Sequence, residues 1–334
     1  MNKRMAYGVG SGVLALAAIL AWRGCAPVFR NAAAARGGQS AKTVKMSAYE
    51  AQIKALAVID ESVILYRELA PLVPRGVTVL SALAVGPDDR LYIGSGRLLV
   101  VLSPQGDEIR RTVLNSDVTC LAADAQGTLY VGLGSTVQVL DTEGRQTVAF
   151  TGIGADAIIT SIAATEDAVF VADARSQTVL RFTPDGVLRQ TITGKTGHPD
   201  ALGFIVPSPY FDIMLGQGDT LWIVNPGRHR LEEYTFQGER IDWWPELAGM
   251  AVESFCGCCN PAHVARLANG SIVTSEKGLS RVKVYSKRGE FRGVVAAPNQ
   301  FDGSELSHDL AVDSKDRILM VDADRLQIRV FELK

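Results

Sequence analysis

The sequence predicts an all-β fold, a six-bladed β-propeller, and two repeated features support this prediction. A strand-turn-strand pattern recurs six times between Leu80 and the C-terminus, with a period of roughly 40 to 50 residues, which is typical of propeller blades. The second strands of the six repeats begin at Leu91, Leu129, Val169, Leu221, Ile272 and Ile318. A turn glycine follows the third strand at Gly106, Gly144, Gly186, Gly238 and Gly289.

The sixth repeat is one strand short. It ends at Phe331–Lys334 after three strands, and an open sheet edge there would expose unpaired N–H and C=O groups. The upstream segment Ser62–Leu69 is rich in β-branched and aromatic residues at the positions a strand requires. We therefore predict that this segment forms the outer strand of the last blade, so that one domain, residues 48–334, closes into a ring.

The N-terminus predicts a membrane anchor. Lys3 and Arg4 precede an apolar run from Met5 to Trp22, close to the ~20 residues that span a bilayer. We interpret residues 1–30 as an uncleaved signal anchor or transmembrane helix. A cleaved signal and a lipoprotein signal ending at Cys25 are the alternatives.

The stretch after this anchor predicts a linker. Residues 31–47 are rich in Ala, Gly, Ser and Gln and show no apolar periodicity. A capping box that begins at Ser47 predicts a short helix through Ala57. We expect the membrane as a partner through the N-terminal helix. The formal net charge of −2 includes no basic excess, so we expect no nucleic-acid partner.

Two parts of the sequence resemble known proteins. The strand pairs Val169–Asp173 with Thr178–Phe182 and Ile318–Asp322 with Ile328–Phe331 resemble those of NHL-repeat six-bladed propellers. The segment Phe255–Pro261, which reads Phe-Cys-Gly-Cys-Cys-Asn-Pro, is similar to one found in a bacterial subgroup of NHL-like proteins. The resemblance implies the fold and no particular activity, because propellers carry many functions. With the anchor, it predicts a single-pass protein of the bacterial inner membrane whose propeller lies in the periplasm.

Antiparallel topology divides the loops between two faces. If the strands of each blade are named A to D from the channel outward, the B–C loops and the D–A connections share one face. All four histidines and the two longest connections, residues 193–212 and 242–262, are predicted to lie on this face. Long loops on a rigid scaffold often carry function, so we expect the working surface here.

A cysteine cluster lies in the second of these connections. Cys256, Cys258 and Cys259 precede His263, and three thiolates with one imidazole could hold zinc, copper or iron. A disulfide within the loop and a redox-active thiol pair are the alternatives, because cysteines outside the cytoplasm are usually oxidised. Cys120 is predicted to be a buried small apolar residue.

Further polar and aromatic residues on this face are candidates for ligand binding. They are His198, Tyr210, Asn225, Arg228, His229, Glu276 and His308. Asn225 and Glu276 also end B strands, where short polar side chains commonly accept bonds from backbone N–H groups of a neighbouring loop. Trp243 and Trp244 could line a pocket or fill the gap between blades.

Cations recur in the B–C loops. They are Arg97, Arg175, Arg228, Lys277 and Arg325. Such a ring would attract a small anionic ligand or an acidic protein partner, unless these residues form ordinary surface ion pairs.

Together these features favour a binding or assembly module whose partner is a protein or a small anionic ligand. The alternative is a metal-dependent lyase or hydrolase that uses His198, His263 and His308. A Ser208–His263–Asp212 hydrolase is less favoured, because the sequence has no Gly-x-Ser-x-Gly elbow.

Overall fold

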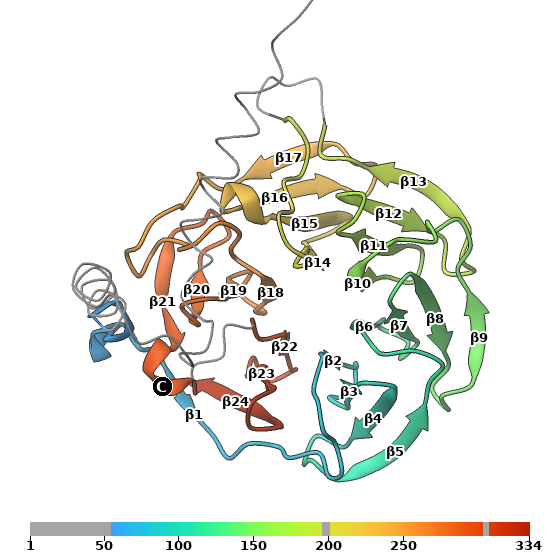
Figure 1. Ribbon diagram of the computed structural model, residues 1–334, viewed down its shortest axis with the longest axis horizontal. Coiled ribbons are helices and arrows are strands. Elements are labelled where there is room, and N and C mark those ends of the chain that lie inside the picture. The colour runs from blue at the N-terminus through green and yellow to red at the C-terminus, as the bar shows by residue number, and fades with distance from the viewer. Residues whose placement is uncertain (1–54, 196–200, 303–306) are drawn as a thin grey trace, which may run out of the picture. The chain divides into compact units, whose positions relative to one another are not determined.

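The structure, a computed structural model, describes residues 55–195, 201–302 and 307–334. Six four-stranded antiparallel sheets surround a central channel in these residues (Figure 1). This confirms the predicted six-bladed propeller. Residues Ala55–Ala57 are helical, as the capping box predicted, while the rest of that helix lies outside the described residues.

The four strand positions repeat around the ring. The inner strands A are β2 (Ala82–Val85), β6 (Cys120–Ala123), β10 (Ile159–Ala164), β14 (Ile213–Leu215), β18 (His263–Arg266) and β22 (Leu310–Val312). The B strands are β3 (Leu91–Ser95), β7 (Leu129–Leu133), β11 (Val169–Asp173), β15 (Thr220–Asn225), β19 (Ile272–Ser275) and β23 (Ile318–Asp322).

The C strands are β4 (Leu98–Leu102), β8 (Thr136–Leu140), β12 (Thr178–Phe182), β16 (Arg230–Thr235), β20 (Val282–Tyr285) and β24 (Gln327–Leu333). The outer strands D are β5 (Glu108–Val113), β9 (Gln146–Ala149), β13 (Leu188–Ile192), β17 (Arg240–Trp243), β21 (Phe291–Ala296) and, for the last blade, β1 (Tyr66–Glu68). Short 3₁₀ turns occur at η1 (Glu61–Val63), η2 (Pro226–Arg228) and η3 (Pro298–Gln300).

The predicted closure of the ring is confirmed. Strand β1 pairs antiparallel with β24, and Glu68 lies opposite Phe331. Arg329 donates to both carboxylate oxygens of Glu68 at 2.7 Å, and its side chain is only 1% exposed. The N-terminal strand is therefore fastened to the last blade by a backbone ladder and by a buried guanidinium.

Removing this carboxylate should weaken the closure. Glu68→Gln leaves the buried Arg329 guanidinium without its main counter-charge. We therefore expect the free energy of unfolding to fall by roughly 2 kcal/mol. The same strand pair supplies the control: Arg67 and Glu332 form an ion pair whose side chains are 66% and 31% exposed. Glu332→Gln should therefore cost less than about 1 kcal/mol. Equal losses in denaturant titrations of the two variants would contradict this assignment.

The hydrophobic core lies between neighbouring blades. The aromatic group between the fourth and fifth blades is an example: Trp244 is fully buried, 5.2 Å from the Tyr285 ring, and its indole donates to the Lys287 carbonyl. Trp244 thus fills the gap between blades, one of the two predicted roles. Trp243 is exposed, with the Arg240 guanidinium over its ring.

A glycine in the next blade makes room for this tryptophan. Gly289 has φ +81, and a Cβ placed there would lie 2.8 Å from the Trp244 ring. Both the backbone conformation and the close approach therefore require glycine at this turn.

The predicted membrane segment, Met5–Trp22, lies outside the described residues. Among the residues that the structure does describe, no helix is long and apolar enough to cross a bilayer.

Candidate functional site at the channel mouth

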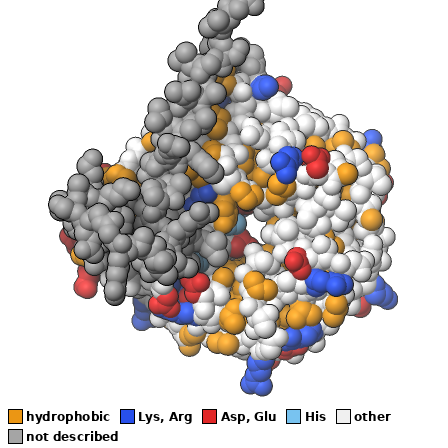
Figure 2. Space-filling model, in the orientation of Figure 1, with side chains coloured by type: hydrophobic (Ala, Val, Ile, Leu, Met, Phe, Trp, Pro, Cys, Tyr) orange, Lys and Arg blue, Asp and Glu red, His pale blue; other side chains and the backbone are white. Residues whose placement is uncertain are grey.

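All six blades contribute to a cavity at one end of the channel. Its volume is about 360 Å³, within the range of small-molecule sites, and Figure 2 shows the hollow at the centre of the ring. Apolar side chains such as Leu80, Val118 and Phe211 form much of its wall, while Asp212, His263 and Asp309 supply charge. A smaller cavity of about 90 Å³ is lined by the same three polar residues.

The charged group of the cavity is a histidine between two aspartates. The Nδ1 atom of His263 lies 3.7 Å from Asp212 Oδ2 and 3.5 Å from Asp309 Oδ1. His263 begins β18, and the aspartates immediately precede β14 and β22. Three inner strands, distant in sequence, therefore converge at the channel.

Backbone N–H groups fix the two carboxylates. Asp212 Oδ2 accepts from the N–H of Val264 at 2.8 Å, which joins the fourth blade to the fifth. Asp309 Oδ2 accepts from the N–H of Leu83 at 2.8 Å, which joins the last blade to the first. The two carboxylates are thus held by hydrogen bonds between neighbouring blades.

Burial and mutual charge give this group unusual proton affinities. Burial raises the pKa of Asp309 to about 6; the charge of Asp212 adds to the rise, and His263 opposes it. Burial acts to lower the pKa of His263, but the close contact with the Asp212 carboxylate and the negative charges of Asp309 and Asp212 outweigh it and raise that pKa. Asp309 thus titrates near pH 6 and His263 above the ordinary range of an imidazole, and shifted pKa values of this kind are common at acid–base sites.

Tyr210 connects the cavity to its rim. Its ring meets His263 edge-on, with centroids 5.9 Å apart and an interplanar angle of 89°. The Lys277 ammonium lies 4.6 Å from the centroid of the same ring and donates to the Ser208 hydroxyl. The predicted ligand residue Tyr210 therefore lies between an imidazole and a cation at the cavity wall.

The cysteine cluster is divided in the structure. The sulfurs of Cys258 and Cys259 are 3.3 Å apart, whereas Cys256 is buried and its backbone N–H donates to Glu276. No disulfide joins the four cysteines that the structure describes. In the same part of the chain, no three His, Cys, Asp or Glu residues are placed to hold one metal ion. The predicted zinc, copper or iron site of Cys256, Cys258, Cys259 and His263 remains a prediction.

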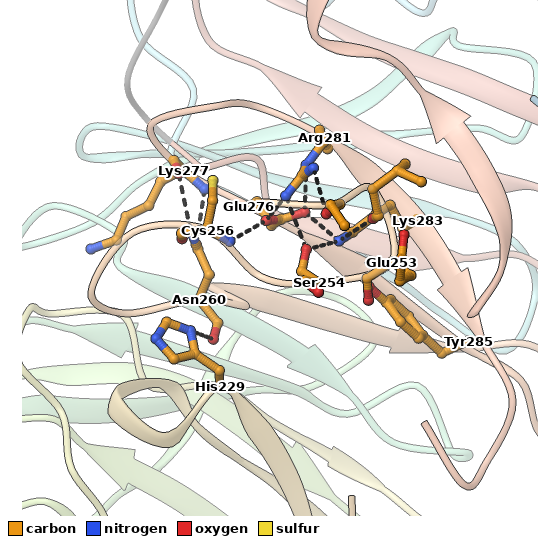
Figure 3. A network of polar contacts seen from close by, with 12 residues as sticks. His229, Glu253, Ser254, Cys256, Asn260, Glu276, Lys277, Arg281, Lys283 and Tyr285 are labelled. Carbon is orange, nitrogen blue, oxygen red and sulfur yellow. Dashed lines mark hydrogen bonds and ion pairs between the residues drawn. The ribbon is translucent and has the colours of Figure 1, made fainter. Parts of the chain in front are cut away.

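Glu276 belongs to a fully buried ion cluster. It pairs with Arg281 and Lys283, each at 2.7 Å, and the three side chains are at most 1% exposed (Figure 3). Arg281 and Lys283 also donate to backbone carbonyls of the 242–262 connection, among them that of Ser254. Glu276, predicted to bind ligand, thus organises the two cations that hold this long loop against the fifth blade.

Asn225 has a similar buried role in the fourth blade. Its Oδ1 accepts from the N–H of Ile205, and its Nδ2 donates to Glu232 and to the Gly203 carbonyl. Asp173, at the matching end of its own B strand, accepts from the N–H of Ile158. These contacts confirm the expectation that polar residues ending the B strands bond to backbone N–H groups of neighbouring loops.

The remaining predicted ligand residues are distributed around the rim. Arg228 pairs with Glu246 at 3.4 Å. His229 is buried, and its Nδ1 bonds the Asn260 carbonyl at 3.2 Å; burial lowers its pKa (Figure 3). His198 lies outside the described residues.

His308 is also directed into the protein. It is 3% exposed, stacks on Phe301, and places Nδ1 2.9 Å from the Val321 carbonyl; burial lowers its pKa. Of the three histidines that the structure describes, only His263 lines the channel cavities. The Ser208 hydroxyl lies between Lys277 Nζ and Cys259 Sγ.

Most of the B–C loop cations make contacts on the protein surface, and one lies beside the cavity. Arg325 forms a bidentate pair with Asp302, Arg228 pairs with Glu246, and Arg97 donates to the Leu114 carbonyl. These are the ordinary surface contacts that were the alternative to a ligand-attracting ring. Lys277 differs, because it lies against Tyr210 beside the cavity.

Sequence reasoning missed Asp309, which lies beside His263 together with Asp212. A signal was present: each directly precedes an inner strand, so the two occupy equivalent positions in blades four and six. Superposing the repeats at their inner strands would have placed both at the channel.

Comparison with known proteins supports the fold. No protein-family description and no curated protein matches the sequence. Among solved structures, a streptogramin B lyase is 11% identical with a TM-score of 0.56, and the match covers 82% of this chain and 100% of that one. A virginiamycin B lyase from Staphylococcus aureus is 14% identical with a TM-score of 0.52 and coverages of 77% and 81%.

A third structure is a catalytically inactive histidine-to-alanine variant of the Staphylococcus aureus lyase with quinupristin. It is 15% identical with a TM-score of 0.57, and the match covers 80% of this chain and 100% of that one. At these identities the likeness establishes a shared propeller architecture. The NHL-type resemblance of the repeats and of the Cys-rich segment stays a prediction.

Proposed function

We propose that this propeller is a binding module whose working site is the channel-mouth cavity. The observation that carries the proposal is His263 held between Asp212 and Asp309 at a cavity to which all six blades contribute. The apolar walls favour a ligand with a hydrophobic body. The two carboxylates favour a cationic or donor group at the channel end of that ligand. This chemistry differs from the anionic ligand that the rim cations predicted.

A matched pair of probes tests the charge preference. We expect 2-phenylethylammonium to bind the full-length chain roughly tenfold more tightly than 3-phenylpropanoate, which has a similar size and the opposite charge. Asp309→Asn should remove most of this difference in calorimetric or NMR titrations at pH 7.5, while Asp185→Asn, on an exposed turn, should not. Preferential binding of the propanoate would show that the cationic rim, rather than the carboxylates, selects the ligand.

The second candidate is an acid–base enzyme. It is favoured by the near-neutral titration of Asp309 together with the raised pKa of His263, and by the inactive histidine variant among the similar propellers. In this candidate His263 exchanges a proton with a substrate in the cavity, and Asp212 and Asp309 orient the imidazole. The metal-dependent lyase or hydrolase that the sequence suggests is one form of this candidate, with its metal ligands unassigned.

Quinupristin is the substrate to try first. The rate of product formation, followed by mass spectrometry, should fall about 100-fold or more in His263→Ala. Turnover that survives in His263→Ala would exclude this histidine as the proton-transfer group. No turnover with the parent protein would favour the binding module.

We also propose that the propeller works outside the cytoplasm, anchored to the inner membrane. The support is the apolar run Met5–Trp22 after Lys3 and Arg4. Protease added to intact spheroplasts should then digest the propeller. Protection until lysis would place it on the cytoplasmic side.

A further inference from the structure

Two adjacent cysteines lie on the same loop beside the cavity rim. Cys258 is exposed and Cys259 is buried, and their sulfurs are 3.3 Å apart. A disulfide bond needs about 2.05 Å between sulfurs, so oxidation requires an approach of little more than an ångström. The pair therefore combines an accessible thiol with a protected one in near-bonding contact.

The buried member of the pair has donors directed at its sulfur. The Ser208 hydroxyl donates to Cys259 Sγ at 3.3 Å, and Lys277 donates to that hydroxyl at 2.5 Å. A cation and a hydrogen-bonded hydroxyl are the neighbours that stabilise a thiolate. By contrast, the backbone N–H of Cys256 donates to Glu276, and the Cys256 thiol lies near that negative carboxylate.

The pKa values of the cysteine thiols agree with these surroundings. Burial acts to raise the pKa of Cys259, but Lys277, Ser208 and Cys258 outweigh it, and the pKa is lowered. Burial raises the pKa of Cys120, and burial together with the charge of Glu276 raises that of Cys256.

Asn260 fixes the cation next to the thiols. This residue directly follows Cys259, and its side chain bonds both backbone groups of Lys277: Oδ1 accepts from the N–H at 3.0 Å and Nδ2 donates to the carbonyl at 3.1 Å (Figure 3). Nδ2 also donates to the Cys256 carbonyl at 2.7 Å. One side chain thus sets the position of the cysteine loop against the Lys277 loop.

We propose that Cys258 and Cys259 form a thiol–disulfide exchange site that reduces a small or peptide disulfide. This activity goes beyond the proposed binding function and uses none of Asp212, His263 and Asp309. Cys258 is the entry thiol because it is exposed. Cys259 is the resolving thiolate because donors stabilise it within contact of Cys258.

The exchange takes place in two balanced steps. Cys258 attacks one sulfur of the substrate disulfide, the S–S bond breaks, and the leaving thiolate takes up the proton that Cys258 loses. The Cys259 thiolate then attacks Cys258 Sγ in the mixed disulfide and releases the second substrate thiolate. The substrate has gained two electrons, and a Cys258–Cys259 disulfide has formed at the expense of the two thiols.

Glutathione disulfide tests the site in the full-length chain with Cys25 replaced by Ser. The parent should release two equivalents of glutathione, and peptide mapping after alkylation should find Cys258 and Cys259 joined. Cys259→Ser should release one equivalent and stop as a mixed disulfide on Cys258. Cys258→Ser should react slowly or not at all, whereas Cys256→Ser should behave as the parent.

Lys277→Gln tests whether Lys277 stabilises the Cys259 thiolate or whether the closeness of the two sulfurs is sufficient for the reaction. We expect this variant to resolve the mixed disulfide on the order of tenfold more slowly at pH 7 and to recover as the pH rises, because less of Cys259 is then a thiolate at neutral pH. A parent that stops at the mixed disulfide would overturn the proposal. So would a Cys258→Ser variant that reacts as fast as the parent, or a Lys277→Gln variant with an unchanged pH profile.

Discussion

Glu276→Gln should lower the free energy of unfolding by about 3–5 kcal/mol, the largest loss expected from a single change of charge in this protein. The substitution leaves Arg281 and Lys283 in a space where both side chains are at most 1% exposed, with no carboxylate between them. The two cations would then repel each other without solvent to screen them. Chemical denaturation at pH 7 measures the loss.

The defect should also be local, because the same cations hold the long loop. Lys283 donates to the carbonyls of Val252 and Ser254, and Arg281 to those of Ala251 and Ser254. We therefore expect amide hydrogen exchange to rise in residues 251–256 before it rises in β20. Faster exchange spread evenly around the ring would contradict this anchoring role.

Raising the pH should repair part of the defect. Burial lowers the pKa of Lys283 to about 8 even with Glu276 present. A lysine whose pKa is lower in the folded state loses its proton more readily there, so stability rises with pH through that value. Glu276 raises the pKa of Lys283, so this pKa falls further when the carboxylate is removed. The deficit of Glu276→Gln should thus shrink as the pH rises towards 8, because the variant's amine becomes neutral first and then needs no counter-charge.

An exposed pair at the start of the neighbouring strand β21 provides the control. Glu290 and Arg292 lie 3.1 Å apart with side chains 65% and 57% exposed. Glu290→Gln should change the free energy of unfolding by less than about 1 kcal/mol and show no pH-dependent recovery. A loss as large as that of Glu276→Gln would mean that burial is not the cause.

The sequence was sufficient for the architecture because the blades repeat. The six residues predicted to begin the second strands all fall inside β3, β7, β11, β15, β19 and β23. The missing outer strand could be located because a short last repeat needs a partner, and β1 supplies it. These inferences depend on period and pairing, which a single sequence displays directly.

The site was less predictable, because its contacts cross between blades. Periodicity places Asp212, His263 and Asp309 at the starts of inner strands, but their meeting depends on the curvature of the whole ring. Glu276 was similarly ambiguous: it directly follows β19, at a position equivalent to that of Asp173 in its own blade. Its longer side chain, however, reaches Arg281, just before β20, and Lys283 within β20. Side-chain length and the identity of the next strand's residues decide that difference.

Asp309→Asn should flatten the dependence of stability on pH between about 4 and 6. Burial raises the pKa of this carboxyl from the ordinary 3.8 to about 6 in the folded protein. The folded state therefore binds a proton that the unfolded state has already lost in this window, so the stability due to this group is lost as the pH rises through it. A shift of about two pKa units corresponds to roughly 3 kcal/mol at most.

His263 changes stability in the same direction at higher pH. Its pKa is also raised, so its contribution is complete below 6.5 and is lost as the pH rises through the folded-state value. Unfolding titrations of the parent from pH 4 to 8 should show a continuous decline from the two groups, and Asp309→Asn should remove the lower part. Asp185→Asn should keep the parent's profile. If Asp309→Asn also kept it, the carboxyl would have to be ionised throughout this range, and the acid–base role of the cavity would lose its main support.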